Sequence, residues 1–297
     1  HGCDRASVGG VRAEAIDGLG RKGDEPPFAE RGARLFDRFR RRTEAIRHEI
    51  HPFNRYTGAG EYSKRPETSL FPCYPVFEEP FMTYRPPVRD MAYTLNEVAG
   101  LSGLMGRGAF EDVSPDLVES VMEEGAKLAA DVLAPLNRAV DGHGIELGEG
   151  GVSVYPALAD AYRKWVEGGW GSLAATPDFG GQGLPTALAV AMQEMWNAAC
   201  MSFGLCPILS QGAIEALTAH GTEAQKRRYL PKLISGEWTG TMNLTEPQAG
   251  SDLNALKAKA VPQSDGSYLI TGTKIFITYG DHDMAENIVH LVLARLP

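Results

Sequence analysis

The hydrophobic pattern of the chain changes near Gly236, and this change limits the possible folds more than any other feature. Before it, apolar residues recur every three or four positions, which is typical of amphipathic helices. After it, apolar and polar residues alternate, which is typical of half-exposed strands. A chain of 297 residues can hold two ordinary domains. We therefore predict an α+β protein with an all-helical domain first and a β domain second.

The helical part carries start and stop signals. Ser114 is a hydroxyl cap before Pro115 at the first helical position, which predicts a helix start. Thr222 and Gln225 fit a capping box, and Gly236 predicts the end of that helix. Other helices are expected at 91–101, 156–167, 185–200 and 210–220, and the apolar stripe after Ser114 is expected to be Leu117, Val121, Leu128 and Val132.

Strands are expected at 238–242, 255–261, 268–271, 274–278 and 288–294. Between two of them, Gln263-Ser264-Asp265-Gly266 predicts a hairpin turn. The last expected strand runs almost to the end of the sequence, so the sheet would be incomplete. We therefore expect the chain to be a fragment of a longer protein.

Composition narrows the functional classes. A net charge of -9 and a pI near 5.3 argue against a general nucleic-acid binder. No apolar run reaches the roughly 18 residues that span a bilayer, and the first residues do not have the pattern of a signal peptide. The four cysteines show no metal-ligand spacing, so we expect no metal site, no disulfide framework and a cytoplasmic location.

Residues 1–81 differ from the rest of the chain. They carry 14 Lys and Arg, 12 of them Arg, against 13 Asp and Glu, whereas the remainder is acidic. Only residues 30–50 fit a helix, and nothing here would bury a core, so we interpret this leader as disordered or not native. The alternative is a basic arm that binds an acidic partner.

Two loops contain many small residues. Residues 176–185 include glycines that could surround a phosphate, but their spacing is not that of a nucleotide motif, so we favour a structural turn beside a pocket. Residues 242–252 contain hydroxyls, small residues and Pro247, and they join the helical and β parts. This second loop is the better candidate for a cofactor site, because its backbone can come close to a ligand.

Several motifs together resemble the acyl-CoA dehydrogenase family over residues 82–297. The family's T-E-P-x-A-G-S-D signature is present at 245–252, and its G-x-K-x-[WF]-I-T run is present at 272–278. The stretches at 179–183 and 220–226 also match. The segments at 84–91 and 133–138 resemble the subgroup that includes 3-methylmercaptopropionyl-CoA dehydrogenases.

The resemblance implies a helical N-terminal domain, followed by the start of an antiparallel β-barrel middle domain. The family's C-terminal helical domain, which carries the catalytic glutamate, is absent from the sequence, so no catalytic residue is assigned and the fragment alone is expected to be inactive. The expected divisions are a leader at 1–81, a family-specific segment at 82–113, the helical domain at 114–237 and the incomplete β domain at 238–297.

The resemblance further implies FAD as cofactor. Met242, Leu244 and Thr245 would meet the isoalloxazine, and Ser251 would bind the FAD pyrophosphate and contribute to the substrate site. Phe276 would flank the flavin, and Thr278 would hydrogen-bond near flavin N5. Gly250 would let the backbone approach the cofactor because it has no Cβ.

The implied activity is α,β-dehydrogenation of an acyl-CoA to a 2-enoyl-CoA, with electrons passed to an electron-transfer flavoprotein. A place in fatty acid metabolism and a homotetramer are also implied. The alternatives are an acyl-CoA oxidase and a non-catalytic flavoprotein of the same fold.

The sequence departs from the family pattern at two positions: Met242 replaces a common aromatic residue, and Tyr279 replaces a small or amide residue. Glu246 precedes a proline and is interpreted as a structural partner of the loop, and His220 and His282 as structural or exposed.

Overall fold

The computed structural model describes residues 11–13 and 84–297, and only these are discussed below. The helices are α2 (Val88–Tyr93), α3 (Pro115–Lys127), α4 (Leu136–His143), α5 (Pro156–Glu167), α6 (Thr186–Ala199), α7 (Met201–His220) and α8 (Glu223–Ser235). The strands are β1 (Val11–Ala13), β2 (Glu146–Gly148), β3 (Gly151–Ser153), β4 (Trp238–Asn243), β5 (Lys259–Pro262), β6 (Tyr268–Thr271) and β7 (Asn287–Val292). The expectation that the leader is disordered or not native concerns residues that, apart from β1, lie outside the described part.

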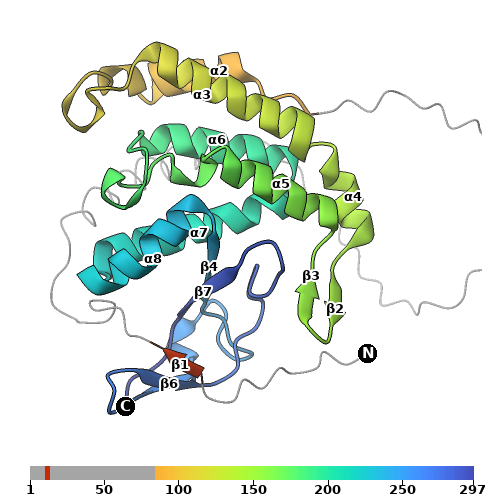
Figure 1. Cartoon of the computed structure of the whole chain (residues 1–297), viewed down its shortest axis with the longest axis vertical. Helices are drawn as coiled ribbons and strands as arrows, with labels where there is room; N and C mark the ends of the chain where they lie inside the picture. The colour runs from red at the N-terminus through yellow and green to blue at the C-terminus, as the bar shows by residue number, and fades with distance from the viewer. Residues whose placement is uncertain (1–10, 14–83) are drawn as a thin grey trace, which may run out of the picture. The chain divides into compact units, whose positions relative to one another are not determined.

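The helices pack in sequence from α3 to α6, from α6 to α7 and from α7 to α8, and β4 lies against α7 and α8 (Figure 1). Aromatic side chains fill the centre of this stack. The indole of Trp165 meets the rings of Trp196 and Phe203 edge to face, at centroid distances of 5.8 and 6.4 Å. All three side chains are buried, so burial of large rings supplies much of the driving force for this half.

The apolar stripe of α3 is one position away from the predicted one. Leu117 is exposed, and the buried positions of α3 and the π-helical Leu128–Leu133 are Val118, Met122, Gly125, Ala129 and Leu133. The prediction was wrong because two of the buried positions are small residues that add no hydrophobic signal. They let α6 approach closely, since a Cβ on Gly125 would lie 1.8 Å from Cε of Met192.

The helical half also contains a hairpin, so it is not all-helical. Strands β2 and β3 pair antiparallel, with Leu147 opposite Val152. Gly151 has a φ of 107°, a conformation that glycine adopts readily and other residues rarely do. The glycines at 148, 150 and 151 leave no run of alternating apolar residues here, so the sequence alone predicts no strand at this point.

Helix α7 is longer than predicted. It begins at Met201 rather than Ser210 and continues through Pro207. Cys200, with an extended backbone, separates α6 from α7. A proline in the second turn removes one internal hydrogen bond but did not end this helix.

The β part forms small sheets and no closed barrel within residues 11–13 and 84–297. Strands β1, β6 and β5 pair antiparallel, and the predicted hairpin turn joins β5 to β6. Strands β4 and β7 pair parallel, with Trp238 opposite Asn287. This parallel pair contradicts the expectation of a purely antiparallel sheet. The expected strand at 255–261 begins only at Lys259, because Leu253–Ala255 forms a 3-10 turn.

The capping box of α8 is confirmed. The Gln225 backbone N–H donates to Thr222 Oγ1 at 3.3 Å, and the Thr222 N–H donates to Gln225 Oε1 at 2.9 Å. We expect Thr222→Ala to lower the free energy of unfolding by about 1 kcal/mol, because the Gln225 backbone N–H at the start of the helix loses its acceptor. Urea unfolding measures this change. Thr222→Ser keeps the cap and should stay close to wild type; equal losses in both variants would contradict the prediction.

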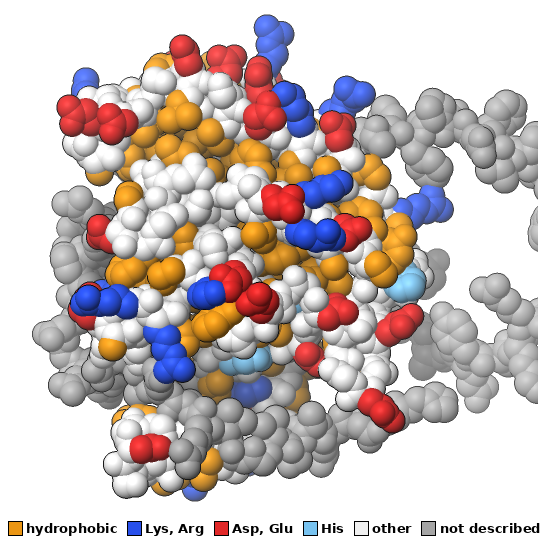
Figure 2. Space-filling view, viewed as in Figure 1, with side chains coloured by type: hydrophobic (Ala, Val, Ile, Leu, Met, Phe, Trp, Pro, Cys, Tyr) orange, Lys and Arg blue, Asp and Glu red, His pale blue; other side chains and the backbone are white. Residues whose placement is uncertain are grey.

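Charged side chains of both signs are interspersed over the face in Figure 2 rather than gathered into one basic patch. No helix among the described residues is long and apolar enough to cross a membrane. The same residues hold no cluster of side chains suited to a metal ion. Of the four cysteines, Cys200 and Cys206 are described, and both are buried free thiols.

Candidate functional site

The loop after β4 is a compact turn held by its own backbone. The N–H of Glu246 donates to the carbonyl of Ala249, and the N–H of Ala249 donates to the carbonyl of Glu246, both at 2.9 Å. Pro247 and Gln248 form the tip between them. The turn leaves Gly250 and Ser251 exposed directly after it.

Glu246 lies at the centre of the loop and is 3% exposed. Its carboxylate accepts from the backbone N–H of Lys257 at 2.7 Å, the N–H of Ala258 at 3.0 Å and the Gln248 amide at 2.6 Å. Lys274 Nζ also donates to Glu246 Oε1, at 2.8 Å. Burial raises the pKa of the carboxyl, but these hydrogen bonds outweigh burial and lower it to about 2. Glu246 is therefore an ionised structural partner of the loop, as expected.

Lys274 ties this loop to the segment that follows β6. Besides Glu246, its ammonium group donates to the carbonyl of Leu244 at 2.9 Å. The neighbouring Ile275 N–H donates to the carbonyl of Thr245 at 3.0 Å. These contacts bring two signatures that are almost thirty residues apart in sequence side by side.

Residues 274–278 are not a strand, so that prediction was wrong. Phe276 has a φ of 58°, which breaks the alternation of an extended chain, and the backbone N–H of Ile275 bonds to the loop rather than to a neighbouring strand. The Phe276 side chain is 88% exposed. A left-handed, exposed aromatic residue is costly for the unliganded chain, and such strain is concentrated at functional sites.

Among the described residues, the side-chain hydroxyls of Thr245, Ser251 and Thr278 make no hydrogen bond. A Cβ on Gly250 would meet no atom within 4 Å. The loop therefore offers free donors and open space beside an exposed aromatic ring, and this donor set fits a flavin nucleotide.

Met242 and Leu244 were predicted to meet an isoalloxazine through backbone groups, and their side chains lie elsewhere. The side chain of Met242 points to α7, where a Cβ on Gly212 would lie 2.5 Å from its Cε. Leu244 is half-buried, and its carbonyl accepts from Lys274. Their predicted contacts with an isoalloxazine would therefore involve backbone groups or a changed rotamer.

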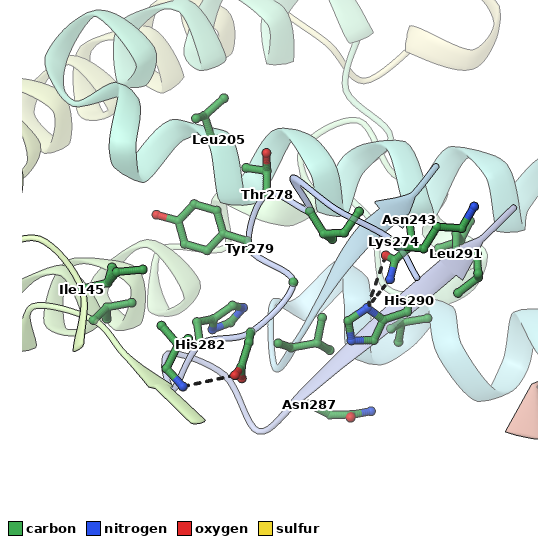
Figure 3. A pocket seen from close by; sticks show the side chains of 18 of the residues that line it. Ile145, Leu205, Asn243, Lys274, Thr278, Tyr279, His282, Asn287, His290 and Leu291 are labelled. Carbon is green, nitrogen blue, oxygen red and sulfur yellow. Dashed lines mark hydrogen bonds between the residues drawn. The ribbon is translucent and has the colours of Figure 1, made fainter. Parts of the chain in front are cut away.

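A cavity of about 1230 Å³ lies between the helical half and β7. Of the predicted site residues, only Thr278 lines it. Figure 3 shows Lys274, Thr278, Tyr279, His282 and His290 along its wall, with Leu205 of α7 and Ile145 before β2 nearby. Apolar and polar groups meet here, as is usual for a site that binds an organic ligand.

Several residues of this wall were missed in the sequence. His290 hydrogen-bonds to the Asn243 side chain, with Nδ1 and Nδ2 3.2 Å apart, and Lys274 holds the loop. Asp281 of the wall and Asp283, which lies outside the wall, accept hydrogen bonds from backbone N–H groups in and directly after β3. The run of two acids around His282, close to Thr278, is a signal that could have identified this segment.

Comparisons with known protein families divide the chain into the same helical part and β part as the structure. Family profiles described as the acyl-CoA dehydrogenase N-terminal domain and the acyl-CoA dehydrogenase middle domain match residues 119–237 and 241–296. A 3-methylmercaptopropionyl-CoA dehydrogenase from Ruegeria pomeroyi is 47% identical over 216 residues, which cover 73% of this chain and 37% of the relative. A butyryl-CoA dehydrogenase from Syntrophomonas wolfei is 35% identical over 215 residues, covering 71% and 35%. The chain thus spans little more than a third of these relatives.

Solved structures show a related fold. Butyryl-CoA dehydrogenase from Megasphaera elsdenii has a TM-score of 0.51 at 24% identity, covering 61% of this chain and 45% of that one. An acyl-CoA dehydrogenase complexed with FAD from Bacillus anthracis has a TM-score of 0.50 at 23% identity, covering 63% and 29%. The two family profiles together match more than half of the sequence and describe consecutive domains of one family. The chain belongs to the acyl-CoA dehydrogenase family.

Proposed function

We propose that this chain holds FAD at the loop after β4, and that the whole protein uses it to dehydrogenate an acyl-CoA thioester at its α and β carbons. The observation that carries the proposal is that the hydroxyls of Thr245, Ser251 and Thr278 form no hydrogen bond with another described residue. They lie on the two signatures that Lys274 joins. The identified relatives are named as acyl-CoA dehydrogenases, and one related structure is named as a complex with FAD.

Each residue has a distinct part in this proposal. FAD, when bound, supplies the hydride acceptor. The hydroxyls of Thr245 and Thr278 would donate to the polar edge of the ring system, where fixed donors would stabilise developing negative charge. Ser251 would donate to the pyrophosphate and would border the substrate. Phe276 would flank the ring, and Gly250 would leave room for the backbone to approach the cofactor.

The hydroxyls can be tested one at a time by titrating the full chain with FAD and following flavin fluorescence. We expect the wild-type chain on its own to bind FAD only weakly, and Thr245→Val and Ser251→Ala to raise this Kd about a further fivefold to tenfold, because each loses one hydrogen bond to the cofactor. Ser264→Ala, in the exposed hairpin turn, is the matched control and should bind like wild type. No binding by wild type, or equal affinity in all variants, would contradict the proposal.

The electron acceptor is a separate question. We propose an electron-transfer flavoprotein for the whole protein, which would then pass few electrons to oxygen. Rapid oxygen consumption by the whole protein with an acyl-CoA would favour the oxidase alternative. A homo-oligomer and a cytoplasmic location also remain proposals that rest on the resemblance and the composition, and native mass measurement and cell fractionation test them.

A further inference from the structure

The segment directly after Thr278 is bound to three different elements. We call residues 279–284 the clasp. At its start, Thr241 Oγ1 of β4 donates to the carbonyl of Thr278 at 2.8 Å. Tyr279, with a φ of 52°, donates its hydroxyl to the carbonyl of Ser202 in α7. The backbone around Thr278 is therefore held by both the sheet and a helix.

Two carboxylates of the clasp hold the β2–β3 hairpin. Asp281 Oδ2 accepts from the backbone N–H of Val152 at 3.1 Å, and Asp283 Oδ1 accepts from the N–H of Val154 at 3.0 Å. At Gly151, a Cβ would lie 3.0 Å from Asp281 Oδ2. Charge-assisted bonds of this kind are stronger than bonds between neutral groups, and they join residues that are 129 positions apart.

His282, between the two acids, points inward and is 7% exposed. Its Nδ1 accepts from the Met284 N–H at 3.2 Å, and its Nε2 lies 3.0 Å from Thr239 Oγ1 of β4. Because Nδ1 accepts, the neutral ring must carry its proton on Nε2. A second proton would have to go on Nδ1, where it would displace the Met284 N–H.

The surroundings of His282 favour the neutral ring. Burial lowers the pKa of His282, and His290 of β7 lowers it further, whereas the carboxylates of Asp281 and Asp283 raise it; burial is the largest effect. The Tyr279 ring, 5.5 Å away by centroids, is uncharged. A histidine whose pKa is lowered by folding contributes stability that is complete above its unfolded pKa and is lost as the pH falls through its folded pKa.

We propose that Asp281, His282 and Asp283 are positioning residues that fasten the β2–β3 hairpin to the clasp, fix Thr278 at the cavity wall, and release the hairpin when His282 takes up a proton. The effect on the cofactor rests on the proposed function. The fastening itself concerns only this chain and can be measured without FAD.

Amide hydrogen exchange of the full chain tests the fastening. We expect Asp281→Ala and Asp283→Ala to speed exchange in residues 151–155 about tenfold at pH 7.5, because a bond to a charged acceptor is lost. Glu149→Ala removes a carboxylate from the tip of the same hairpin and is the matched control. Exchange in both aspartate variants that equals the Glu149→Ala rate would overturn the fastening.

The pH dependence of amide exchange shows whether protonation of His282 releases the hairpin or whether the contact is independent of pH. After correction for intrinsic rates, wild-type exchange in residues 151–155 and 279–284 should rise between pH 7.5 and 5.0. His282→Asn keeps an acceptor near Met284 but cannot take up a proton, so its rates should stay level. Should this variant melt early by circular dichroism, His282→Gln replaces it. A pH step that persists in both variants would remove His282 from the switch.

FAD titration then tests whether Asp281 and Asp283 position Thr278 for the cofactor. We expect Asp281→Ala and Asp283→Ala to raise the FAD Kd about fivefold, and Asp281→Asn, which keeps an acceptor oxygen, to recover most of the affinity. Faster exchange with unchanged FAD affinity would overturn the positioning of Thr278. If wild type binds no FAD, the proposed function fails, whereas the exchange measurements still decide whether the clasp exists.

Discussion

Glu246→Ala is expected to lower the free energy of unfolding by about 3–5 kcal/mol, because removing one partner of a buried ion pair leaves the other charge uncompensated. Lys274 is only 10% exposed and would be left with the Leu244 carbonyl as its hydrogen-bond partner. The backbone N–H groups of Lys257 and Ala258 would lose their acceptor at the same time. Tryptophan fluorescence in a urea titration reports the loss.

The same carboxylate predicts an acid transition. Folding lowers the pKa of Glu246 from an ordinary value near 4.5 to about 2. A lowered carboxyl pKa contributes stability that is complete above the unfolded pKa and is lost as the pH falls through the folded pKa. The contribution is about 3 kcal/mol at pH 7, and more than half of it should be gone by pH 3. The difference between wild type and Glu246→Gln should shrink over this range.

The control is an ion pair of the same type on the surface. Glu124 and Lys127 on α3 are both more than 60% exposed, so Glu124→Ala should change stability little. Glu246→Met with Lys274→Met should recover part of the loss, but not all, because the backbone donors stay without an acceptor. Equal effects of Glu124→Ala and Glu246→Ala would contradict this account.

The second large effect is expected at Gly181. A Cβ there would lie 1.9 Å from the carbonyl oxygen of Ala175, whose backbone cannot move aside cheaply. That oxygen also accepts from the Gly183 N–H at 3.0 Å. Gly181→Ala should therefore cost at least about 3 kcal/mol of unfolding free energy and leave a less cooperative urea transition.

Gly180 is the matched neighbour. It has a φ of 94°, but a Cβ would meet nothing within 4 Å, so Gly180→Ala should cost only about 1–2 kcal/mol from its left-handed backbone. If both variants lost the same free energy, close backbone packing would not be what the turn requires. The difference would also support the interpretation of residues 176–185 as a structural turn.

Signals carried by a few neighbouring residues predicted the structure well. The Ser114 cap, the Thr222 capping box and the 263–266 turn all depend on bonds within four residues, so the sequence contains everything that decides them. The stripe of α3 failed because its burial depends on α6, a partner far along the chain. The prediction of strand pairing was wrong for the same reason, since nothing near Trp238 in the sequence specifies a parallel partner.

In the candidate site too, the sequence predicts what local motifs decide and does not predict contacts between distant segments. Thr245, Ser251 and Thr278 could be proposed as site residues because they belong to the two family motifs. Glu246 could be interpreted as structural because a proline follows it. The hydrogen bonds that Lys274 and Asp281 make could not be predicted, because they join segments that are far apart in sequence and that only the fold brings together. The strain at Phe276 was also hidden, since an Ile-Phe-Ile run reads as a strand.

The parallel pairing of β4 with β7 also has a consequence for the order in which this protein can fold on the ribosome. Trp238 cannot complete its sheet until Asn287 and the residues after it have been made. At about 5–20 residues per second, this interval lasts several seconds. Meanwhile β4 can dock on α7, but its free edge is open to other chains. Slower translation of this interval should therefore increase aggregation, and chaperone binding should be strongest there.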